Sequence, residues 1–370
     1  MSATSEWATV VVEARRVAAD IAGLLGVEVD AATILTGRAA IMNLARPGRI
    51  SSGGATRLLR TVDGWCAVAL PRDDDVAALP ALTEADAVAD DPWDALTCWA
   101  ATCSTAQLVT RAQLLDIAVA ALGEAAAEAP IVRRCGTGTE PRRVGGLLVA
   151  DLSSLWAGPL CGQLLARAGA VVVKVESPSR PDGTRRGEPA FFDWMNAGKL
   201  SYAVDFDSDG DALRELLGVA DIVIEGSRPA ALRRRGLSAE DLPGRPGRIW
   251  LRIRGYRDQP DRPAFGDDAA VAGGLVGDGP VLLGDAVADP LTGLEAARAV
   301  GESLRRGGGE VVEVSMAQVA ARYAGLPQSP DSGALAESPT LPPAGAPASP
   351  LGADNAAVEL LVSERRGAPC

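Results

Sequence analysis

Hydrophobic residues near the start of the chain recur every three or four positions, which is the spacing of an amphipathic helix. The positions that show it are Val10, Val11, Ala14, Val17, Ile21 and Leu24. Two short runs, 56–61 and 65–70, are typical of strands, and Asp63-Gly64 between them favours a hairpin turn. Ala- and Leu-rich segments then predict helices to about residue 128. We expect residues 1–130 to form a smaller α+β domain.

From Val144 onward, short apolar runs alternate with helical patterns. The predicted strands are 147–152, 170–175, 201–204, 221–225, 248–253 and 310–314, and the predicted helices are 158–168, 212–219 and 291–304. This alternation indicates βαβ units, so we expect an α/β domain over 144–324. Its mainly parallel, Rossmann-like sheet would carry helices on both faces and bind ligands at the carboxyl ends of its strands.

Two segments lack such patterns. Residues 131–143 are polar and contain Gly and Pro, which predicts a linker. Residues 325–350 are rich in Pro and Ala and predict an extended arm. Residues 351–370 are expected to hold a C-terminal helix and tail.

Charge and composition exclude several function classes. The formal net charge of −12 disfavours nucleic acid and anionic membranes as partners. The 370 residues include no histidine, which excludes Ser-His and Cys-His nucleophile systems, His-ligated metals and imidazole acid–base catalysis. The six cysteines show neither CxxC nor metal-ligand spacing, so we expect free thiols in a reducing compartment and no metal site. No signal peptide and no membrane-spanning run is recognisable, which predicts a cytoplasmic protein.

Two kinds of segment after predicted strands suit phosphate groups. The turn 153–159 offers small residues and backbone N–H groups at a helix start, with Trp156 able to stack on a base. Arginines follow other strands at 180–186 and 228–235, and arginine binds phosphate bidentately. The alternative is an ordinary βα turn and solvated loops whose charges pair with each other.

Asp267 and Asp268 open a predicted helix of very small residues. One of them is an N-cap in the structural interpretation. In the functional interpretation, a carboxylate attacks a thioester and gives a mixed anhydride, which is covalent catalysis that needs no histidine.

A set of short motifs occurs in a fixed order along the second half of the chain. They are Ala157-Gly158-Pro159, Ala168-Gly169-Ala170, Lys174-Val-Glu176, Asp182-Gly-Thr-Arg185, Asn196-Ala-Gly-Lys199-Leu-Ser201, Ala220-Asp221, Asp289–Gly293 and Gly307-Gly-Gly before a Val-x-Val strand. With this set, the chain resembles the class III CoA transferases, the family of formyl-CoA and carnitine-CoA transferases that also contains 2-methylacyl-CoA racemases.

The resemblance implies a CoA transferase that moves CoA between carboxylic acids through an aspartyl covalent intermediate. Asp267, with Asp268 second, is the expected catalytic residue. The implied CoA contacts are Trp156, Ala157, Gly158, Arg185, Gly226, Ser227, Arg234 and Arg254. The resemblance further implies no permanently bound cofactor, an acyl-CoA and a carboxylic acid as substrates, and an interlocked homodimer.

The chain departs from the family pattern in three ways. Residues 34–123 resemble the family's smaller domain but lie N-terminal to the CoA-binding domain, as in a permuted member or one half of a fused tandem. Counting back from Gly274 assigns Gly266, not an acid, to the position of the family's catalytic aspartate. Ser177 stands where many members carry an arginine.

These departures leave two alternative functions open. One is a non-catalytic CoA-binding or scaffold protein of the same fold. The other is an acyl-CoA racemase or isomerase, although the related racemases use a histidine that this chain lacks.

Overall fold

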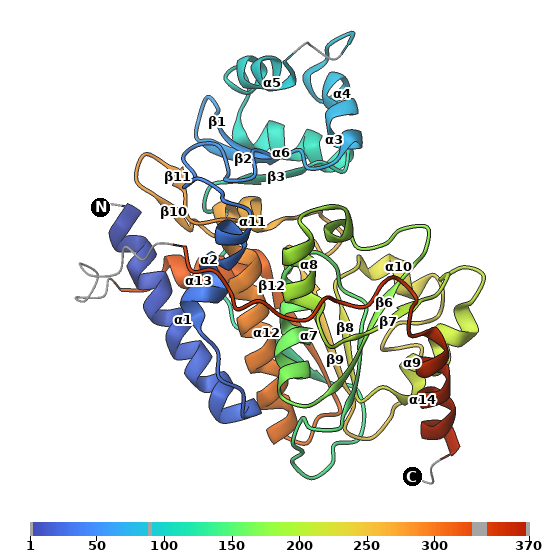
Figure 1. Cartoon of the computed structure of the whole chain (residues 1–370). Coiled ribbons are helices and arrows are strands. Elements are labelled where there is room, and N and C mark those ends of the chain that lie inside the picture. The colour runs from blue at the N-terminus through green and yellow to red at the C-terminus, as the bar shows by residue number, and fades with distance from the viewer. Residues whose placement is uncertain (1–2, 88–90, 328–338, 368–370) are drawn as a thin grey trace.

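A sheet of seven strands organises the larger part of the molecule (Figure 1). The computed structural model describes residues 3–87, 91–327 and 339–367. In spatial order the strands are β4 (Ile131–Arg134), β12 (Glu310–Ser315), β9 (Ile249–Arg254), β8 (Ile222–Glu225), β5 (Leu148–Asp151), β6 (Val171–Glu176) and β7 (Leu200–Ala203). All neighbours run parallel except β4, which pairs antiparallel with β12. The predicted α/β fold is confirmed.

The strand order contains one reversal of direction. Strands β5, β6 and β7 follow each other outward, and β8, β9 and β12 then follow each other outward on the other side of β5. The connections that leave the carboxyl ends of β5 and β8 therefore run to opposite faces, and this switch point is where an open α/β sheet is expected to form its ligand crevice. This reversal determines where a ligand can reach the backbone of the sheet.

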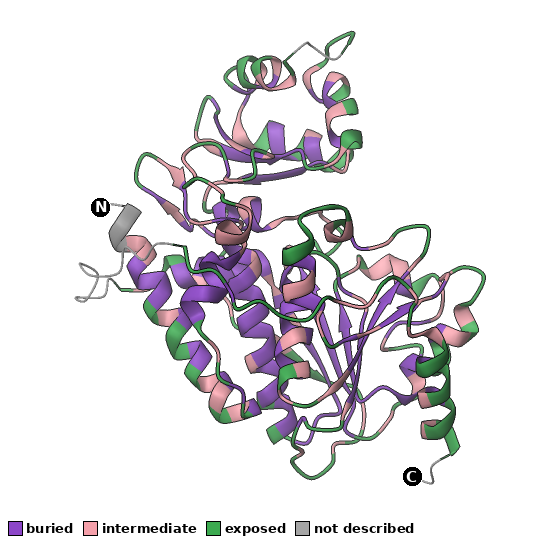
Figure 2. Cartoon of the chain, in the orientation of Figure 1, coloured by how far each residue is buried: buried purple, intermediate pink, exposed green. Residues whose placement is uncertain are grey.

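Helices cover both faces of the sheet, because alternate strand residues point to opposite sides. Val149, Ile222, Leu251 and Val312 pack in one core with α7 (Ala157–Arg167), α12 (Ala288–Arg305) and α13 (Met316–Ala324). Leu148, Val223, Trp250 and Val311 pack in a second core with α9 (Gly210–Val219) and α14 (Asn355–Gly367). Figure 2 shows the strands buried between these layers.

The first two helices belong to the core of the large sheet. Helices α1 (Ala3–Leu25) and α2 (Ala31–Ile41) contribute apolar residues such as Val17, Ile21 and Leu35 to the core that also contains α12. Gly301 of α12 permits this packing, since a Cβ placed there would lie 2.8 Å from the Cβ of Leu24. Figure 1 shows α1 beside α12, away from the smaller sheet.

A separate antiparallel sheet follows α2 in the chain. Its strands are β1 (Thr56–Arg60), β2 (Trp65–Ala69) and β3 (Ala118–Ala121), and its helices are α3 (Asp73–Ala77), α4 (Leu79–Thr83), α5 (Pro92–Ala100) and α6 (Thr105–Leu114). The hairpin predicted around Asp63-Gly64 is confirmed. The prediction of helix to residue 128 is wrong for β3, because small Ala and Val residues fit a buried strand as well as a helix, and pairing with β2 decides between them.

The connecting segments also differ from the sequence pattern. The predicted linker 131–143 contributes strand β4, which pairs with the edge of the large sheet. Residues 339–354 run across the molecule without a helix or strand. Backbone N–H groups of this stretch donate hydrogen bonds to the side chains of Thr36, Asp193 and Ser201. The remaining elements are the 3₁₀ turn Gly183–Arg186, α8 (Pro189–Asn196), α10 (Pro229–Arg233), α11 (Gly266–Ala272), β10 (Val276–Gly277) and β11 (Val281–Leu282). None of the helices within the described residues has the length and apolarity that crossing a membrane requires.

The close contact of α1 with α12 gives a paired stability prediction. Gly301→Ala is expected to lower the free energy of unfolding by about 1–3 kcal/mol, because the new methyl group overlaps Leu24. Gly23→Ala, in α1 with no atom within 4 Å of its Cβ position, is expected to raise it by about 0.5–1 kcal/mol. Urea unfolding followed by circular dichroism measures both. A stabilised Gly301→Ala variant would contradict the packing described for these helices.

Candidate functional site

Glycine and serine residues meet where the strand order reverses. Ser153 follows β5, and Gly226 follows the neighbouring β8. A Cβ at Gly226 would lie 3.3 Å from the Cβ of Ser153, and one at Gly158 would overlap the Ser153 side chain. The buried hydroxyl of Ser227 has no hydrogen-bond partner among the described residues. Closely spaced backbone and one buried hydroxyl without a partner therefore lie at the switch point, the position at which open α/β sheets bind phosphate-bearing ligands.

The residues predicted for CoA contact in the first turn are covered rather than exposed. Trp156 is 3 % exposed, and its ring meets the ring of Phe191 edge-to-face at 5.4 Å between centroids. Ala157 and Gly158 are also buried, at the start of α7. Gly226 is exposed and Ser227 half-buried. Gly158 and Gly226 thus both pack against Ser153, while the Trp156 ring is turned towards Phe191.

The predicted arginines fall into two groups. The Arg185 guanidinium lies 2.6 Å from the Glu176 carboxylate and 4.3 Å from the Phe192 ring centroid. Arg254 is buried, pairs with Glu225 at 3.1 Å and donates to the backbone carbonyl of Ser227. The charges of these two are compensated within the protein, and they hold the loops in place. Arg234, by contrast, is exposed, and its side chain donates to the Ala230 carbonyl of α10 and forms no ion pair with any described residue.

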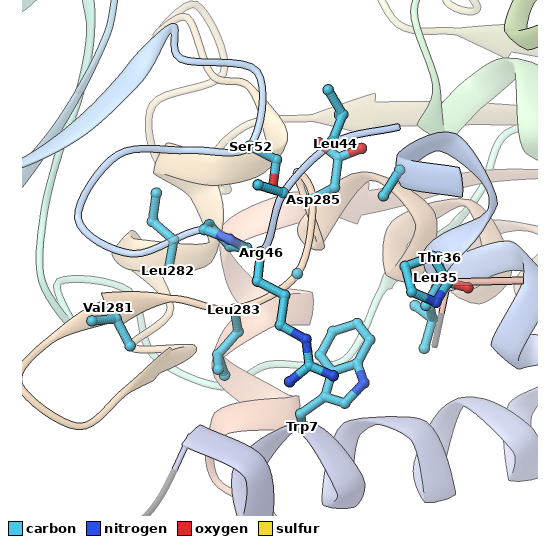
Figure 3. A pocket seen from close by; sticks show the side chains of 15 residues that line it. Trp7, Leu35, Thr36, Leu44, Arg46, Ser52, Val281, Leu282, Leu283 and Asp285 are labelled. Atoms are coloured by element: carbon cyan, nitrogen blue, oxygen red, sulfur yellow. The ribbon is translucent and has the colours of Figure 1, made fainter. Parts of the chain in front are cut away.

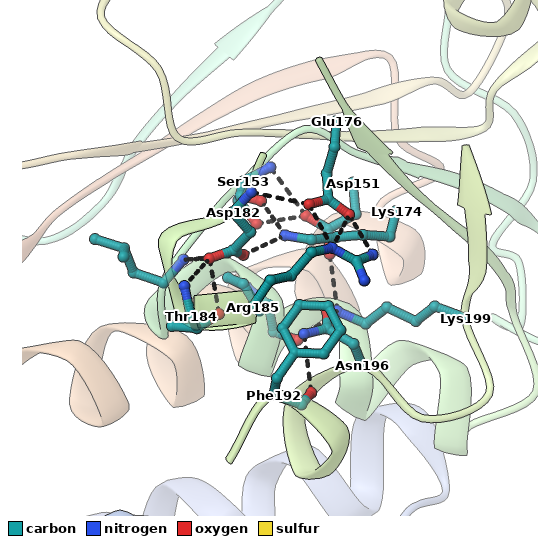
Figure 4. Close-up of polar contacts among 12 residues, drawn as sticks. Asp151, Ser153, Lys174, Glu176, Asp182, Thr184, Arg185, Phe192, Asn196 and Lys199 are labelled. Atoms are coloured by element: carbon teal, nitrogen blue, oxygen red, sulfur yellow. Dashed lines mark hydrogen bonds and ion pairs between the residues drawn. The ribbon is translucent and has the colours of Figure 1, made fainter. Parts of the chain in front are cut away.

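Two buried ammonium groups fix the turn after β5 (Figure 4). Lys199 is fully enclosed; it lies 2.9 Å from the Asp151 carboxylate and donates to the Pro159 carbonyl. Lys174 pairs with Asp182 at 2.7 Å and donates to the Ser153 carbonyl. These are the two lysines of the chain.

The same network determines the loop after β6. The Asp182 carboxylate accepts hydrogen bonds from the N–H groups of Leu155 and Thr184 as well as from Lys174. Burial raises the pKa of the Asp182 carboxyl, but the Lys174 ammonium and these donors lower it more, so the pKa lies below its ordinary value. Leu155 adopts a left-handed φ of 71°, which the bond to Asp182 sustains. The ionised Asp182 carboxylate therefore holds the loop after β6 against the turn after β5.

One guanidinium close to this turn acts on three carboxyl groups. Arg38 of α2 pairs with Asp285 at 2.6 Å, and its charge also acts on Asp267 and Asp289. The same guanidinium lies 5.7 Å from the ring centroid of Trp156. Arg38 thus links the acidic cluster, defined as Asp267, Asp285 and Asp289, to Trp156 at the start of α7.

The position predicted for the family's nucleophile has no room for a side chain. Gly266 begins α11, and a Cβ there would overlap the Ala286 carbonyl and the Asp289 carboxylate. The Gly266 N–H also donates to Asp289. A carboxyl group near this point must therefore come from a neighbouring residue.

The two adjacent aspartates have different surroundings. Asp268 is 0 % exposed, and its Oδ1 accepts the Phe265 N–H at 2.7 Å, while its Oδ2 has no partner among the described residues. Asp267 is half-buried and accepts hydrogen bonds from the Ala286 N–H at 3.1 Å and the Thr56 side chain. Neither aspartate is the N-cap that the structural interpretation expected: Phe265 holds that position, and Asp268 lies three residues on and accepts the Phe265 N–H. Asp267 is the aspartate that remains accessible.

Burial and mutual repulsion raise the pKa of each carboxyl in this region. Desolvation and then Asp285 raise the pKa of Asp267 to about 6. Desolvation raises the pKa of Asp289 to about 7, and the pKa of Asp268 to about 8. Asp267 is therefore mainly ionised at neutral pH, whereas Asp268 is mainly protonated. An ionised carboxylate in a partly desolvated site is a competent nucleophile.

The sequence did not reveal Arg38 or Asp285 as site residues. Arg38 lies in a helix with no motif around it, and Asp285 lies in a Gly- and Ala-containing loop. Asp289 stood in a motif, Asp289–Gly293, but without a role. Only the packing of α2 against the large sheet brings these groups together. Within the described residues, no group of His, Cys, Asp or Glu has an arrangement suited to a metal ion.

A family model described as CoA-transferase family III matches residues 144–345. This range runs from the residues before β5 to the arm and covers more than half of the chain. The chain belongs to CoA-transferase family III. Helices α1 and α2 and the smaller sheet lie outside the match, so Arg38 reaches the site from a segment beyond it.

Several curated proteins are similar to this family III chain. A succinyl-CoA–D-citramalate CoA-transferase of Chloroflexus aurantiacus is 32 % identical over 199 residues, which cover 48 % of this chain and 50 % of that protein. A succinate–glutarate CoA-transferase of Agrobacterium fabrum is 32 % identical over 205 residues, covering 48 % and 51 %. The chain spans about half the length of the curated relatives it matches.

One solved structure in the same range is a CAIB/BAIF family protein from Brucella suis. It is 29 % identical, with a TM-score of 0.44, over 49 % of this chain and 55 % of that one.

The lysine network gives a prediction about the stability of this family III chain. Lys199→Met leaves the Asp151 carboxylate buried without its cation, and this is expected to cost about 3–5 kcal/mol of unfolding free energy. Adding Asp151→Asn is expected to recover part of the loss. Arg16→Met, at an exposed ion pair, is the control and is expected to change stability by less than about 0.5 kcal/mol. Urea unfolding at pH 7 checks this, and equal effects of Lys199→Met and Arg16→Met would contradict it.

The protonated Asp268 predicts a pH dependence. The folded protein holds this proton up to about pH 8, while the unfolded chain releases it near its ordinary pKa of 3.8. Stability attributable to Asp268 is therefore present at pH 4 and is lost as pH rises towards 8, by up to about 1.4 kcal/mol per pH unit. Asp268→Asn keeps an acceptor for the Phe265 N–H and is expected to be more stable than wild type at pH 8 but not at pH 4. Parallel stability–pH curves for the two proteins would refute the assignment.

Proposed function

We propose that this protein transfers CoA between carboxylic acids, with Asp267 as the nucleophile. The observation that carries the proposal is a partly accessible carboxylate at the start of α11, next to Arg38 and beside the switch-point crevice. Membership in CoA-transferase family III and the relatives named for succinyl-CoA transfer support the reaction class.

The proposed reaction proceeds through two kinds of aspartyl intermediate. The Asp267 carboxylate oxygen attacks the thioester carbon, the C–S bond breaks, and CoA leaves as thiolate. The thiolate then attacks the aspartyl carbonyl of the mixed anhydride, which releases the first acid as carboxylate and leaves Asp267 as a CoA thioester. The acceptor carboxylate repeats these two steps in reverse and restores the Asp267 carboxylate.

Charge in the acidic cluster is the main constraint on this chemistry. The attacking group must be ionised, although Asp285 and Asp289 lie close by and raise its pKa. Arg38 is the cation that opposes this repulsion. We propose that Arg38 keeps Asp267 ionised and draws the incoming carboxylate towards it.

We propose that the phosphates of CoA lie at the switch-point crevice. Ser227, Gly226 and the backbone after β5 line the crevice. Arg186 and Arg233 are exposed near the ends of β6 and β8 and form no ion pair within the described part of the chain, so their charges are open to an anion. Arg234 lies beside them. Arg185 and Arg254 hold these loops by their internal pairs with Glu176 and Glu225.

The proposal also covers the order of the domains and the oligomeric state. We propose that residues 34–123 act as the family's smaller domain in a permuted chain and that two copies form an interlocked homodimer. The α11 helix contacts β2 and β3, so the smaller sheet lies against the helix that carries Asp267, as a substrate-covering domain must.

A second candidate function is CoA binding without turnover. Gly266, with no room for a side chain, favours it, because the position expected for the family's nucleophile is empty of a carboxyl group. This candidate predicts CoA binding but no covalent intermediate.

Trapping of the intermediate separates the two candidates. After incubation with succinyl-CoA, intact-protein mass spectrometry is expected to show one bound CoA that hydroxylamine removes. Asp267→Asn is expected to abolish the adduct, and Asp268→Asn, the matched control next to it, to retain it. Adduct formation by wild type should decline below about pH 6 as Asp267 becomes protonated. Wild-type protein that binds CoA in calorimetry yet never forms the adduct would establish the non-catalytic function instead.

A further inference from the structure

A small pocket at the amino ends of β9 and β12 is lined by two arginines, Arg245 and Arg248. Cys135, which follows β4, and Gly309, which precedes β12, contribute to the same wall. The space inside is about 10 Å³, which is close to the room that one water molecule requires. Because β9 and β12 run parallel to β8, the pocket lies at the edge of the sheet opposite to Gly226 and the switch point.

Arg248 is a buried cation without a carboxylate partner among the described residues. It is 6 % exposed, and its guanidinium donates only to two backbone carbonyls there, those of Pro243 at 3.1 Å and Gly218 at 2.8 Å. Its buried Nε–H has no hydrogen-bond partner in the described part of the chain. Burial, and after it the charge of Arg245, lower the pKa of the Arg248 guanidinium, which shows that its positive charge is poorly compensated. A buried donor and a buried charge together require an acceptor that is negatively charged.

The arginines around this pocket exceed the carboxylates that face them. Three guanidinium groups share the single carboxylate of Asp221: those of Arg365 at 2.7 Å, Arg142 at 3.2 Å and Arg245 at 3.4 Å. Asp221 also acts on the charge of Arg248. Four positive charges therefore depend on one negative charge at this edge of the sheet, although the chain as a whole carries a net charge of −12.

Other acidic groups near the pocket are already engaged. Glu240 pairs with Arg252 at 2.6 Å, and Glu310, at the start of β12, pairs with Arg306 at 2.9 Å. Burial raises the pKa of the Cys135 thiol, so this group stays neutral at pH 7 and supplies no negative charge to the pocket. The positive charge of Arg248 therefore calls for a counterion from solution.

A wider cavity between α1, α2 and the β10–β11 hairpin has a different character (Figure 3). Its volume is about 150 Å³, and most of its wall is apolar. Arg46 is the one basic residue among the described residues that line it, and Figure 3 shows its side chain extending towards Trp7. Arg46 is exposed, so water solvates its charge and no bound anion is needed there.

We propose that the small pocket binds one monatomic inorganic anion, chloride, between Arg245 and Arg248. The anion accepts the hydrogen bond that the Arg248 Nε–H lacks and neutralises part of the positive charge around Asp221. The small volume of the pocket favours a monatomic anion over phosphate or a carboxylate, and the Arg245 side chain, 32 % exposed, can shift to admit an ion slightly larger than water. This site goes beyond the proposed function, because it lies at the other edge of the sheet and needs no CoA transfer.

Thermal unfolding of the full chain in different sodium salts tests the site. At pH 7 and equal ionic strength, about 200 mM chloride is expected to raise the unfolding midpoint of wild type by about 2 °C relative to gluconate, as for a ligand at about tenfold its Kd. Bromide, which is also monatomic, is expected to have the same effect as chloride. Circular dichroism measures the midpoints.

Three variants assign the effect to the pocket. Arg245→Gln removes one side of the site and is expected to abolish the difference between chloride and gluconate. Arg365→Gln is the matched control, because Arg365 pairs with the same Asp221 carboxylate but does not line the pocket; it is expected to lower the midpoint in both salts and to keep the difference. Arg46→Gln, in the wider cavity, is also expected to keep it.

The contrary results are equally specific. Equal midpoints of wild type in chloride and gluconate, or a full chloride effect in Arg245→Gln, would overturn the proposed site. A larger rise with phosphate than with chloride, abolished by Arg245→Gln, would overturn the choice of a monatomic anion. Formation of the CoA adduct on Asp267 is expected to be the same in wild type and Arg245→Gln, so the chloride site and the proposed function stand or fall separately.

Discussion

The pairing of Arg38 with Asp285, beside the ring of Trp156, is the contact on which the site depends. It places one positive charge among three carboxyl groups whose burial already raises their pKa values. Without that charge, the pKa values of Asp267, Asp285 and Asp289 would rise further, because like charges in a desolvated site favour protonation. The arginine comes from α2, so the α1–α2 hairpin is part of the site as well as part of the core.

The large sheet and the turns at its edge hold the Arg38–Asp285 pair in position. The ring of Trp156 lies against the Arg38 guanidinium. The turn that carries Trp156 is held by Lys174 and Lys199, which donate to backbone carbonyls on either side of it and form buried ion pairs. Replacing such pairs by apolar residues is often neutral for stability, and our hypothesis is that these pairs serve to define the loop geometry. The reversal of strand order then brings Gly226 and Ser227 against the same turn. CoA phosphates at the crevice and a thioester near Asp267 are consistent with this one framework.

The sequence predicted the large sheet well because its signal is local. Each buried parallel strand is a short apolar run, and each intervening helix has its own periodicity, so β5, β6, β8, β9 and β12 were all expected near their observed bounds. Strand β3 was missed because Ala118–Ala121 carries no periodicity that separates strand from helix. Strand β4 was missed because its pairing partner, β12, lies far along the chain. The site was less predictable: Asp267 and Asp268 stood out as neighbours, but the cap geometry that separates them, and the arrival of Arg38 and Asp285, depend on tertiary packing.

The most direct test of the central claim follows an oxygen atom. If Asp267 forms the anhydride, turnover of succinyl-CoA with an acceptor acid labelled with ¹⁸O in its carboxylate leaves one acceptor oxygen on the regenerated aspartate. Proteolysis and fragment mass spectrometry are then expected to locate the ¹⁸O on Asp267 and not on Asp268 or Asp289. Label on either of the other two, or turnover with no label on the protein, would contradict the account.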